Sequence, residues 1–483
     1  MIPLNESTLT NLPDSIAVTL PTYPRSITHR ICHIGVGGFH RAHQAVYLHR
    51  LLMAGAAQGW GICGIGLRQD DQPLFDALDA QDGLYSVWQQ SATAQSVEVI
   101  GSIMEWVYAA DDPSLAIAKM ADPATAMVSL TITEKGYCVN PATNRLDLEN
   151  PLIKQDLQHP EQPTSAVGVI VEALRLRHIQ GLAPFTVVSC DNLRENGHLT
   201  QSVIVDYANA MSPSLAQWIQ GHVRCPNSMV DRITPIPNPQ LQHTLCTQWG
   251  VNDQALLVCE DWIQWVLEDQ FSGPRPPFEQ ADVILSNDVP AFEAMKIGLL
   301  NGAHSALAYL GLLKGYTTIH EALNDTDIEA AITQYMEEAI PTLKPIDGMD
   351  FRQYSQAVIA RFKNPAIEDT LTRVAEDSSK KMIEFIRPMA LKQQSIGTSF
   401  RANAYAVACW IMYLTSKRDH AQAHYKDPSR DTLLAATGSD CFSLTAFLNE
   451  FFSLNEMPEP SQKAFADAVS DALERIRSDV LKP

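Results

Sequence analysis

The chain has 483 residues, more than a single hydrophobic core usually supports, so we expect at least two domains. Its 46% hydrophobic content allows a sizeable core, and its 35 basic and 55 acidic residues give a formal net charge of −20. This acidity argues against nucleic acid or an anionic membrane surface as a partner, because both are negatively charged.

Targeting and redox signals are weak along the whole chain. The N-terminal segment has no basic stretch followed by an apolar run, and no segment reaches the roughly 20 apolar residues that span a bilayer. The nine cysteines are widely spaced and include no CxxC pair, so they predict neither a disulfide framework nor a zinc site. We therefore expect a cytoplasmic protein in a reducing compartment.

The first half of the chain alternates short strands with helical stretches. Apolar, β-branched runs predict strands at residues 30–36, 60–67, 97–103, 125–133, 184–190 and 282–286. Between them, residues 41–55 and 164–181 carry apolar side chains at helical spacings of three and four. This alternation is typical of an α/β fold with a doubly wound, mostly parallel, Rossmann-like sheet. We assign residues 1–286 to this dinucleotide-binding domain.

From residue 287 onward the pattern is helical, and strand signals are nearly absent. A stretch rich in Pro and Gly at 272–280 lies just before the change. The predicted helical stretches are 327–343, 354–362, 390–416 and 462–480. We expect residues 287–483 to form a mostly α-helical domain for substrate binding and catalysis.

The first predicted strand runs directly into a glycine loop, HIGVGGFHRAH, at residues 33–43. Gly35 and Gly37 allow a tight turn and a close approach of the backbone to a pyrophosphate at a helix N-terminus. His40 stands where the usual dinucleotide fingerprint has its third glycine, so a purely structural turn is the alternative.

An acidic residue, Asp70, follows the second predicted strand. An acid at this place binds the ribose hydroxyls of NAD and repels the 2′-phosphate of NADP. The separation of Asp70 from Gly35 exceeds the usual 20 or so residues. Asp71 is an equally available acid by spacing.

His40 and His43 form an HxxH pair in the glycine loop. Zinc sites normally use three or four protein ligands, and no third ligand of matching spacing follows. We expect these side chains to pack around the helix terminus and predict no metal site.

The apolar stretch at 292–311 carries four polar side chains, Glu293, Lys296, Asn301 and His304. On an ideal α-helix all four fall within one sector of about 140°. Because unpartnered burial of such groups is costly, they form either a satisfied polar cluster between helices or the wall of a site. In a site, desolvation lowers the pKa of Lys296 towards the range of a general base.

Another polar group, CDNLRENG, follows the strand at 184–190. Asp191, Asn192 and Asn196 lie where a parallel strand ends, and open α/β sheets bind ligands at that edge. For Asn192 a helix-capping or turn role is the alternative.

Together, these motifs resemble the long-chain, zinc-independent mannitol dehydrogenase family of polyol oxidoreductases. The resembling segments extend from about Ile31 to Tyr413, and the K-x4-N-x2-H spacing of Lys296, Asn301 and His304 is the family's catalytic signature. The resemblance implies an NAD-dependent dehydrogenase that interconverts a polyol and a ketose, with D-mannitol and D-fructose as the first expectation. Its partner would be a small molecule, and monomers are common among the relatives.

The resemblance also implies a role for each candidate residue. Lys296 would be the general base, and Glu293 would lie on the proton path to bulk water. Asn192 and Asn301 would form the oxyanion hole, and His304 would orient the substrate. The other matched residues are Asp231, Arg373 and Lys381 for the polyol, and Gly35, Gly37 and Asp70 for NAD.

Two other functions stay open. The family includes oxidoreductases of the hexonate pairs mannonate/fructuronate and altronate/tagaturonate, and Arg373 and Lys381 could bind a carboxylate as readily as a hydroxyl. Several of those enzymes carry a DGSxKLP-like run where this chain reads AEDSSKKMIEF at 375–385. This departure favours a neutral polyol and leaves the alignment of Lys380 and Lys381 open. An NAD-binding regulator without catalysis is the alternative from another class, but it would not require the complete Lys, Asn and His set.

Overall fold

A computed structural model describes residues 1–235, 238–416, 425–438 and 442–480 of the chain. The chain divides into two compact units, Met1–Pro290 and Ala291–Pro483. Eight cysteines in the described residues are buried and carry free thiols, and Cys441 lies outside the described residues.

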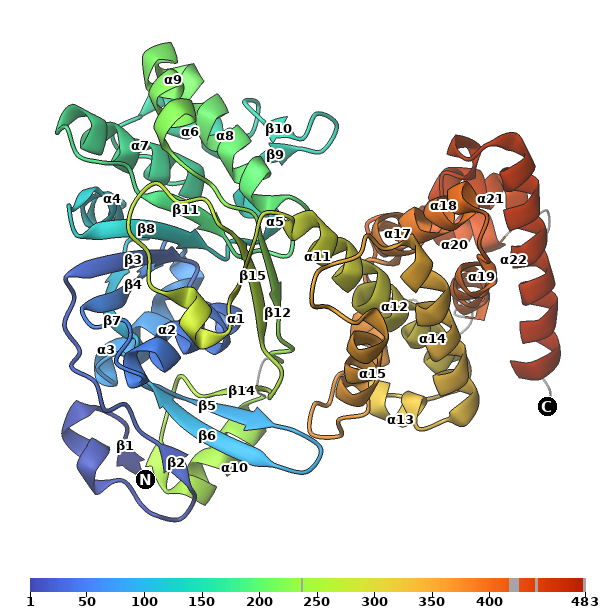
Figure 1. Cartoon of the computed structure of the whole chain (residues 1–483), viewed down its shortest axis with the longest axis horizontal. Helices are drawn as coiled ribbons and strands as arrows, with labels where there is room; N and C mark the ends of the chain where they lie inside the picture. The colour runs from blue at the N-terminus through green and yellow to red at the C-terminus, as the bar shows by residue number, and fades with distance from the viewer. Residues whose placement is uncertain (236–237, 417–424, 439–441, 481–483) are drawn as a thin grey trace. The chain divides into compact units, whose positions relative to one another are not determined.

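The first unit is built on a five-stranded parallel sheet in the order β11-β8-β3-β4-β7 (Figure 1). The strands are β3 (His29–Ile34), β4 (Trp60–Gly66), β7 (Ile103–Tyr108), β8 (Thr125–Leu130) and β11 (Thr186–Ser189). Numbered along the chain, this is the 5-4-1-2-3 order of a Rossmann fold read from one edge, which confirms the predicted fold class. Strands β4, β8 and β11 are buried along their whole length, which explains their continuous apolar runs.

Helices cover both faces of this sheet, and successive strand residues face opposite cores. Ile31 and Ile62 belong to one core cluster, and the next residues, Cys32 and Cys63, belong to the other. The covering helices include α2 (Gln44–Met53) and α3 (Gln72–Ala80) on one side, and α4 (Ser114–Ala121), α7 (Ala166–Ile179) and α8 (Asn196–Met211) on the other.

Two smaller sheets complete the first unit. A four-stranded mixed sheet has the order β14-β5-β6-β2, and a three-stranded sheet has the order β12-β15-β16. Their strands are β2 (Val18–Thr19), β5 (Tyr85–Gln90), β6 (Gln95–Ile100), β12 (Ser228–Asp231), β14 (Leu257–Glu260), β15 (Gln264–Glu268) and β16 (Ile284–Ser286).

The expectation that the strand predicted at 97–103 belongs to the parallel sheet is wrong. Its residues form β6, which pairs antiparallel with β5 in a hairpin and does not join the parallel sheet. The edge strand of the parallel sheet is β7, which begins where the predicted strand ends. All of β7 except Ile103 is only half-buried, so its sequence lacks the apolar run of a central strand.

The second unit is helical, and its described residues contain no strand beyond one isolated bridge between Thr318 and Thr370. Helix α12 (Gly302–Leu313) lies at its centre and packs against α14 (Thr326–Ala339), α16 (Leu371–Val374) and α19 (Arg401–Ser416). The other helices of eight or more residues in the described part of this unit are α15 (Phe351–Phe362), α18 (Arg387–Ile396), α20 (Arg430–Gly438), α21 (Leu444–Phe451) and α22 (Glu459–Val480). The single helix predicted at 390–416 is wrong, because Gly397 adopts a left-handed φ of 70° and ends α18.

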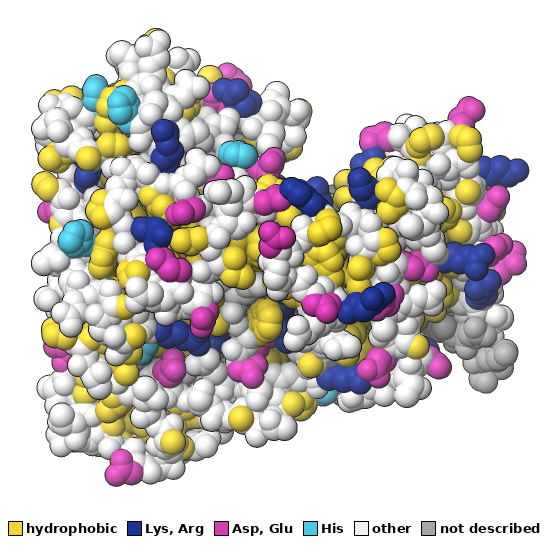
Figure 2. Space-filling model, viewed as in Figure 1, with side chains coloured by type: hydrophobic (Ala, Val, Ile, Leu, Met, Phe, Trp, Pro, Cys, Tyr) yellow, Lys and Arg dark blue, Asp and Glu magenta, His cyan; other side chains and the backbone are white. Residues whose placement is uncertain are grey.

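The described part of the chain shows neither a membrane-spanning helix nor, on the face in Figure 2, a continuous basic surface. None of the helices in the described part of the chain is both long and apolar enough to cross a bilayer. On the face shown in Figure 2, Lys and Arg side chains are scattered among Asp and Glu side chains. That mixed pattern differs from the continuous basic surface that nucleic acid selects.

Candidate active site

The glycine loop lies between the carboxyl ends of β3 and β8, the point where the strand order reverses. Gly35 has a φ of 90°, and a Cβ atom on it would lie 2.2 Å from the carbonyl oxygen of Thr131. The Thr131 hydroxyl donates a hydrogen bond of 2.6 Å to the Gly35 carbonyl. Both the backbone angle and the space therefore require glycine here.

Gly37 has a different environment. It precedes α1 (Gly38–Ala42) with a φ of −83°, which any residue can adopt. A Cβ atom here would meet nothing closer than the Gly35 carbonyl oxygen at 3.9 Å. The chain thus leaves open space over Gly37, and a ligand such as a pyrophosphate can approach the backbone closely.

His33, on β3, contacts this loop through its ring nitrogens. Its Nδ1 lies 2.8 Å from the Ser129 hydroxyl, and its Nε2 lies 2.9 Å from the Thr131 hydroxyl and 3.2 Å from the Gly35 carbonyl. Burial lowers the pKa of His33 to about 3, so the ring is neutral. His40, in place of the third glycine, stacks on His33 with ring centroids 3.3 Å apart. At the position of the fingerprint's third glycine, this chain therefore has His40, whose ring packs on the ring of His33.

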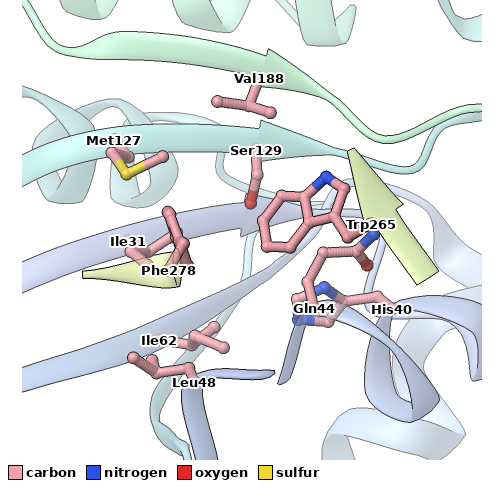
Figure 3. Close-up of a pocket in the computed structure, with 10 residues that line it drawn as sticks. All are labelled: Ile31, His40, Gln44, Leu48, Ile62, Met127, Ser129, Val188, Trp265 and Phe278. Atoms are coloured by element: carbon pink, nitrogen blue, oxygen red, sulfur yellow. The ribbon is translucent and has the colours of Figure 1, made fainter. Parts of the chain in front are cut away.

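A small cavity lies behind the loop, between the parallel sheet, α2 and the Trp265 ring (Figure 3). Buried polar atoms of His40, Gln44 and Trp265 have no hydrogen-bond partner within the described residues. The cavity offers about 10 Å³ to the centre of a water molecule, which is room for about one water. It is too small for a sugar or a nucleotide, so it is no candidate for the substrate site.

The HxxH residues pack separately. His43 Nε2 lies 2.8 Å from the Gln264 carbonyl, and its ring stacks on Phe39 at 4.9 Å. Among the described residues no group of three or more His, Cys, Asp or Glu side chains could hold a metal ion. That the protein works without a metal stays a prediction.

Asp70 and Asp71 follow β4 in a short 3-10 turn. The Asp71 carboxylate accepts the backbone N–H of Arg68 at 3.1 Å and so caps the turn. The Asp70 side chain is 84% exposed and pairs with the Arg68 guanidinium at 3.1 Å. The structure therefore leaves Asp70, more than Asp71, able to face a ribose.

The polar group after β11 divides into structural and exposed residues. Asp191 is buried and accepts hydrogen bonds from the backbone N–H groups of Ile132 (3.1 Å) and Thr133 (2.8 Å) and from the Tyr137 hydroxyl (2.6 Å). Asn196 is also buried and is bonded to Ser228. Both fix the loops at the carboxyl edge of the sheet, whereas Asn192 is exposed at that edge.

Asp231 is the last residue of β12 and is buried. Its Oδ2 accepts a hydrogen bond of 3.1 Å from Trp262 Nε1. A short β-strand and an indole thus fix the direction of this carboxylate.

In the second unit, the helix that carries Lys296 is not a straight α-helix. Residues Lys296–Asn301 form a π turn between α11 (Val289–Met295) and α12, and the Gly302 N–H donates to the Ile297 carbonyl five residues earlier. The angles calculated for an ideal α-helix therefore do not apply within this turn. Because a π turn closes its hydrogen bonds over five residues, it brings Asn301 closer to the side of Lys296 than a regular α-helix would. Such turns often occur at functional sites.

The polar side chains of this helix are largely buried. Glu293 and Lys296 expose 8% and 7% of their surface, and one oxygen of the Asn301 amide is buried without a partner in the described residues. Leu300, Leu307 and Ala308 are buried as well. The fold thus shields the Lys296 side chain from most of the solvent.

His304 lies one turn further, on α12. Its ring stacks on Phe362 with centroids 4.7 Å apart, and its Nε2 lies 3.7 Å from Asp369 Oδ2. Burial lowers the pKa of His304 to about 4, against the opposing effect of the Asp369 carboxylate. The ring is neutral at neutral pH and has one nitrogen donor and one acceptor.

Arg373 and Lys381 belong to the same cluster as His304, because the charges of both act on its pKa. Lys381 donates a hydrogen bond of 2.8 Å to the Val374 carbonyl, and burial lowers the pKa of Lys381. Lys380 instead lies 3.7 Å from Glu384, with both side chains 42% exposed. Of the two candidate lysines, Lys381 is the one beside His304.

A second π turn, Met382–Ile386, follows Lys381 and contacts the π turn that begins at Lys296. Two helix irregularities therefore meet in the centre of the second unit. They bring together the helix segments that carry the proposed base and one of the proposed polyol ligands.

Each unit therefore gathers its own set of candidates. In the first unit, the sheet edge carries Gly35, Gly37, Asp70 and Asn192, while Asp231 ends β12. In the second unit, Glu293, Lys296 and Asn301 share one helix, and His304, Arg373 and Lys381 surround Asp369. Sequence analysis missed Asp369, although its spacing of four residues from Arg373 is typical of an ion pair. It also missed His33 and Thr131.

Comparison with known proteins gives matches over nearly the whole chain. The family described as "Mannitol dehydrogenase Rossmann domain" matches residues 29–280, and "Mannitol dehydrogenase C-terminal domain" matches residues 288–477. Mannitol dehydrogenase 2 of Saccharomyces cerevisiae is 43% identical over 438 residues, which cover 90% of this chain and 87% of the yeast protein. D-mannonate oxidoreductase of Escherichia coli is 43% identical over 411 residues, which cover 84% of each. A solved structure of Pseudomonas fluorescens mannitol 2-dehydrogenase, in a ternary complex with NAD and D-mannitol, is 38% identical with a TM-score of 0.86, covering 99% of this chain and 98% of that one.

Proposed function

Because the chain belongs to the mannitol dehydrogenase family, we propose that it interconverts a polyol and a ketose, with D-mannitol and D-fructose as the first pair. It is an NAD-dependent oxidoreductase that acts on CH–OH groups. The observation that carries the proposal is the buried Lys296 at the start of a π turn that ends at Asn301.

Lys296 is proposed as the general base that takes the proton of the reacting hydroxyl. Desolvation disfavours its ammonium form, and Lys296 is only 7% exposed. Glu293, three residues earlier, would pass the proton on to bulk water. The proposal thus uses both buried charged residues of the helix.

The alkoxide that forms needs hydrogen-bond donors in fixed positions. We propose the amides of Asn301 and Asn192 for this role and the neutral ring of His304 for orienting the substrate. The Asn301 side-chain oxygen is buried without a partner in the described residues, so it could accept a hydrogen bond from a substrate hydroxyl while the amide N–H group faces the alkoxide.

Gly35, Gly37 and Asp70 are proposed to hold NAD. The open backbone at Gly37 fits a pyrophosphate, and the exposed carboxylate of Asp70 fits ribose hydroxyls. Bound there, NAD would supply the acceptor for the hydride of the carbon that carries the reacting hydroxyl. The other hydroxyls of the polyol are assigned to Asp231, Arg373 and Lys381.

A hexonate substrate is the second candidate, and the equal identity to D-mannonate oxidoreductase favours it specifically. The purified protein should be tested with D-mannitol, D-sorbitol, D-arabinitol, D-mannonate and D-altronate, each with NAD and with NADP. The formation of reduced cofactor is followed by absorbance, and the product is identified. We expect D-mannitol with NAD to give the highest kcat/KM and a ketose as product. The highest value for a hexonate would favour the second candidate, and no reduction with any compound would contradict both.

A further inference from the structure

Asp369 is a buried carboxylate in the second unit, and the mechanism above gives it no role. It is 6% exposed and lies in the turn between α15 and α16. Its backbone carbonyl accepts the Ile319 N–H at 3.0 Å, and its own N–H donates to the Ile367 carbonyl at 2.8 Å. These two hydrogen bonds hold the backbone of Asp369 in place within the turn.

The carboxylate holds the guanidinium of Arg373 through two parallel bonds. Nε lies 2.6 Å from Oδ1, and Nη2 lies 2.5 Å from Oδ2. Such bidentate pairs are strong and fix the direction of both groups. The Arg373 side chain is nevertheless 62% exposed, so N–H groups outside the pair remain accessible.

The same carboxylate faces the other polar groups of the cluster. It lies 3.7 Å from His304 Nε2, and its charge acts on Lys381. His304 is neutral and Lys381 is engaged by the Val374 carbonyl, so the direct counter-charge of Asp369 is Arg373. Arg361 also lies near His304 and is buried.

We propose that Asp369 is a specificity-determining residue, which pairs with Arg373 and thereby makes the cluster of His304, Arg373 and Lys381 select against carboxylates and for uncharged polyols. The inference rests on the proposed function, in which Arg373 and Lys381 bind the substrate. An anion brought to Arg373 must displace Asp369 or lie beside it, and like charges at such distances repel strongly. A hydroxyl group accepts a hydrogen bond from the accessible N–H groups of Arg373 without that repulsion.

The test compares wild type with Asp369→Asn, which keeps the size of the side chain and removes its charge. The measured quantity is the hexonate preference, defined as KM for D-mannitol divided by the inhibition constant of D-mannonate against mannitol oxidation. We expect this preference to rise at least about tenfold in Asp369→Asn. An unchanged preference, or a parallel loss for both compounds, would overturn the proposal and make Asp369 merely structural.

Two further variants separate charge from structure. Asp377→Asn removes an exposed carboxylate that acts on Lys381, and the hexonate preference should change less than about twofold. The double variant Asp369→Asn/Arg373→Gln removes both charges, and the gain of the single variant should disappear. A gain that persists without Arg373 would overturn the proposal.

A folding defect of Asp369→Asn is detected by thermal melting. If Asp369→Asn does not fold, the single variant Arg373→Gln provides the test. It leaves Asp369 without its counter-charge, so the hexonate preference should fall. An equal or higher preference would overturn the proposal. If wild type oxidises no polyol, the proposed function fails and this inference fails with it. If wild type is active and the preference does not respond, only the role of Asp369 fails.

Discussion

Gly35 and Thr131 meet where β3 and β8 end, and a Cβ atom on Gly35 would lie 2.2 Å from the Thr131 carbonyl oxygen. The hydrogen bond from the Thr131 hydroxyl to the Gly35 carbonyl, 2.6 Å long, joins the same two residues. The glycine loop is thus fixed to the neighbouring strand at the reversal point of the sheet. Two nearby glycines should therefore respond differently to substitution.

We predict that Gly35→Ala destabilises the protein and Gly37→Ala does not. The φ of 90° at Gly35 alone costs about 1–3 kcal/mol for alanine, and the contact with Thr131 adds to that. Gly37→Ala should melt like wild type but bind NAD more weakly, since its methyl group enters the open space over the backbone. Thermal melting and NAD titration check both. An equal drop in melting temperature for Gly35→Ala and Gly37→Ala would contradict the different roles assigned to the two glycines.

We predict that Asp70→Ala raises the ratio of kcat/KM with NADP to that with NAD by at least about tenfold, because a like charge no longer faces the 2′-phosphate. Arg68, which pairs with Asp70, then becomes available to the phosphate. The double variant with Arg68→Ala should lose most of this gain. Asp71→Ala, the matched control, should leave the ratio unchanged. If Asp71→Ala alone relaxes the preference, the assignment of Asp70 is wrong.

The lowered pKa of His304 predicts a pH dependence of stability. The folded pKa is about 4 and the unfolded value is about 6.5, so between these values the unfolded state binds more protons. The free energy of unfolding should therefore fall as the pH decreases from 6.5 to 4. His304→Phe, which keeps a ring against Phe362, should lose part of this slope in urea titrations, whereas exposed His159→Gln should not. Equal slopes in all three proteins would contradict the buried neutral ring.

We predict that chelation leaves activity unchanged. The lysine mechanism needs no Lewis acid, and the described residues hold no cluster of three metal ligands. Activity should be measured before and after dialysis against excess EDTA. Loss of activity that zinc restores would overturn the lysine mechanism.

The fold was largely predictable because the central strands are buried on both faces. Continuous apolar runs mark β4 and β8, and the glycine loop marks the turn after β3. The edge strand β7 was missed because half-buried residues such as Glu105 interrupt its apolar pattern. The antiparallel partner of β6 was also unpredictable, since a strand's periodicity does not reveal its neighbour.

The sequence predicted which polar residues the helix with Lys296 carries, but not the geometry of that helix. Polar residues in an apolar helix signal a site, and Lys296, Asn301 and His304 match a known spacing. The π turn at Lys296 has no signature in periodicity, because it depends on contacts such as those with the second π turn at Met382–Ile386. Asp369 was missed because what distinguishes it is its burial beside His304, and neither can be read from the sequence.

The central claim is that Lys296 removes the hydroxyl proton. A positioned general base typically raises the reaction rate about 10²–10⁴-fold. Lys296→Ala should therefore lower kcat for mannitol oxidation by at least that factor, while NAD binding is retained. Lys344→Ala serves as a matched control for loss of a lysine in the same unit and should leave kcat nearly unchanged.

The most direct measurement is the pH–rate profile of mannitol oxidation for wild type and Lys296→Ala with NAD in excess. The proposed base must be neutral to act, so the wild-type rate should rise with pH through one inflection. In Lys296→Ala the residual rate should show no such inflection. An inflection that persists unchanged in Lys296→Ala would assign the base to another group and reduce this helix to a structural element.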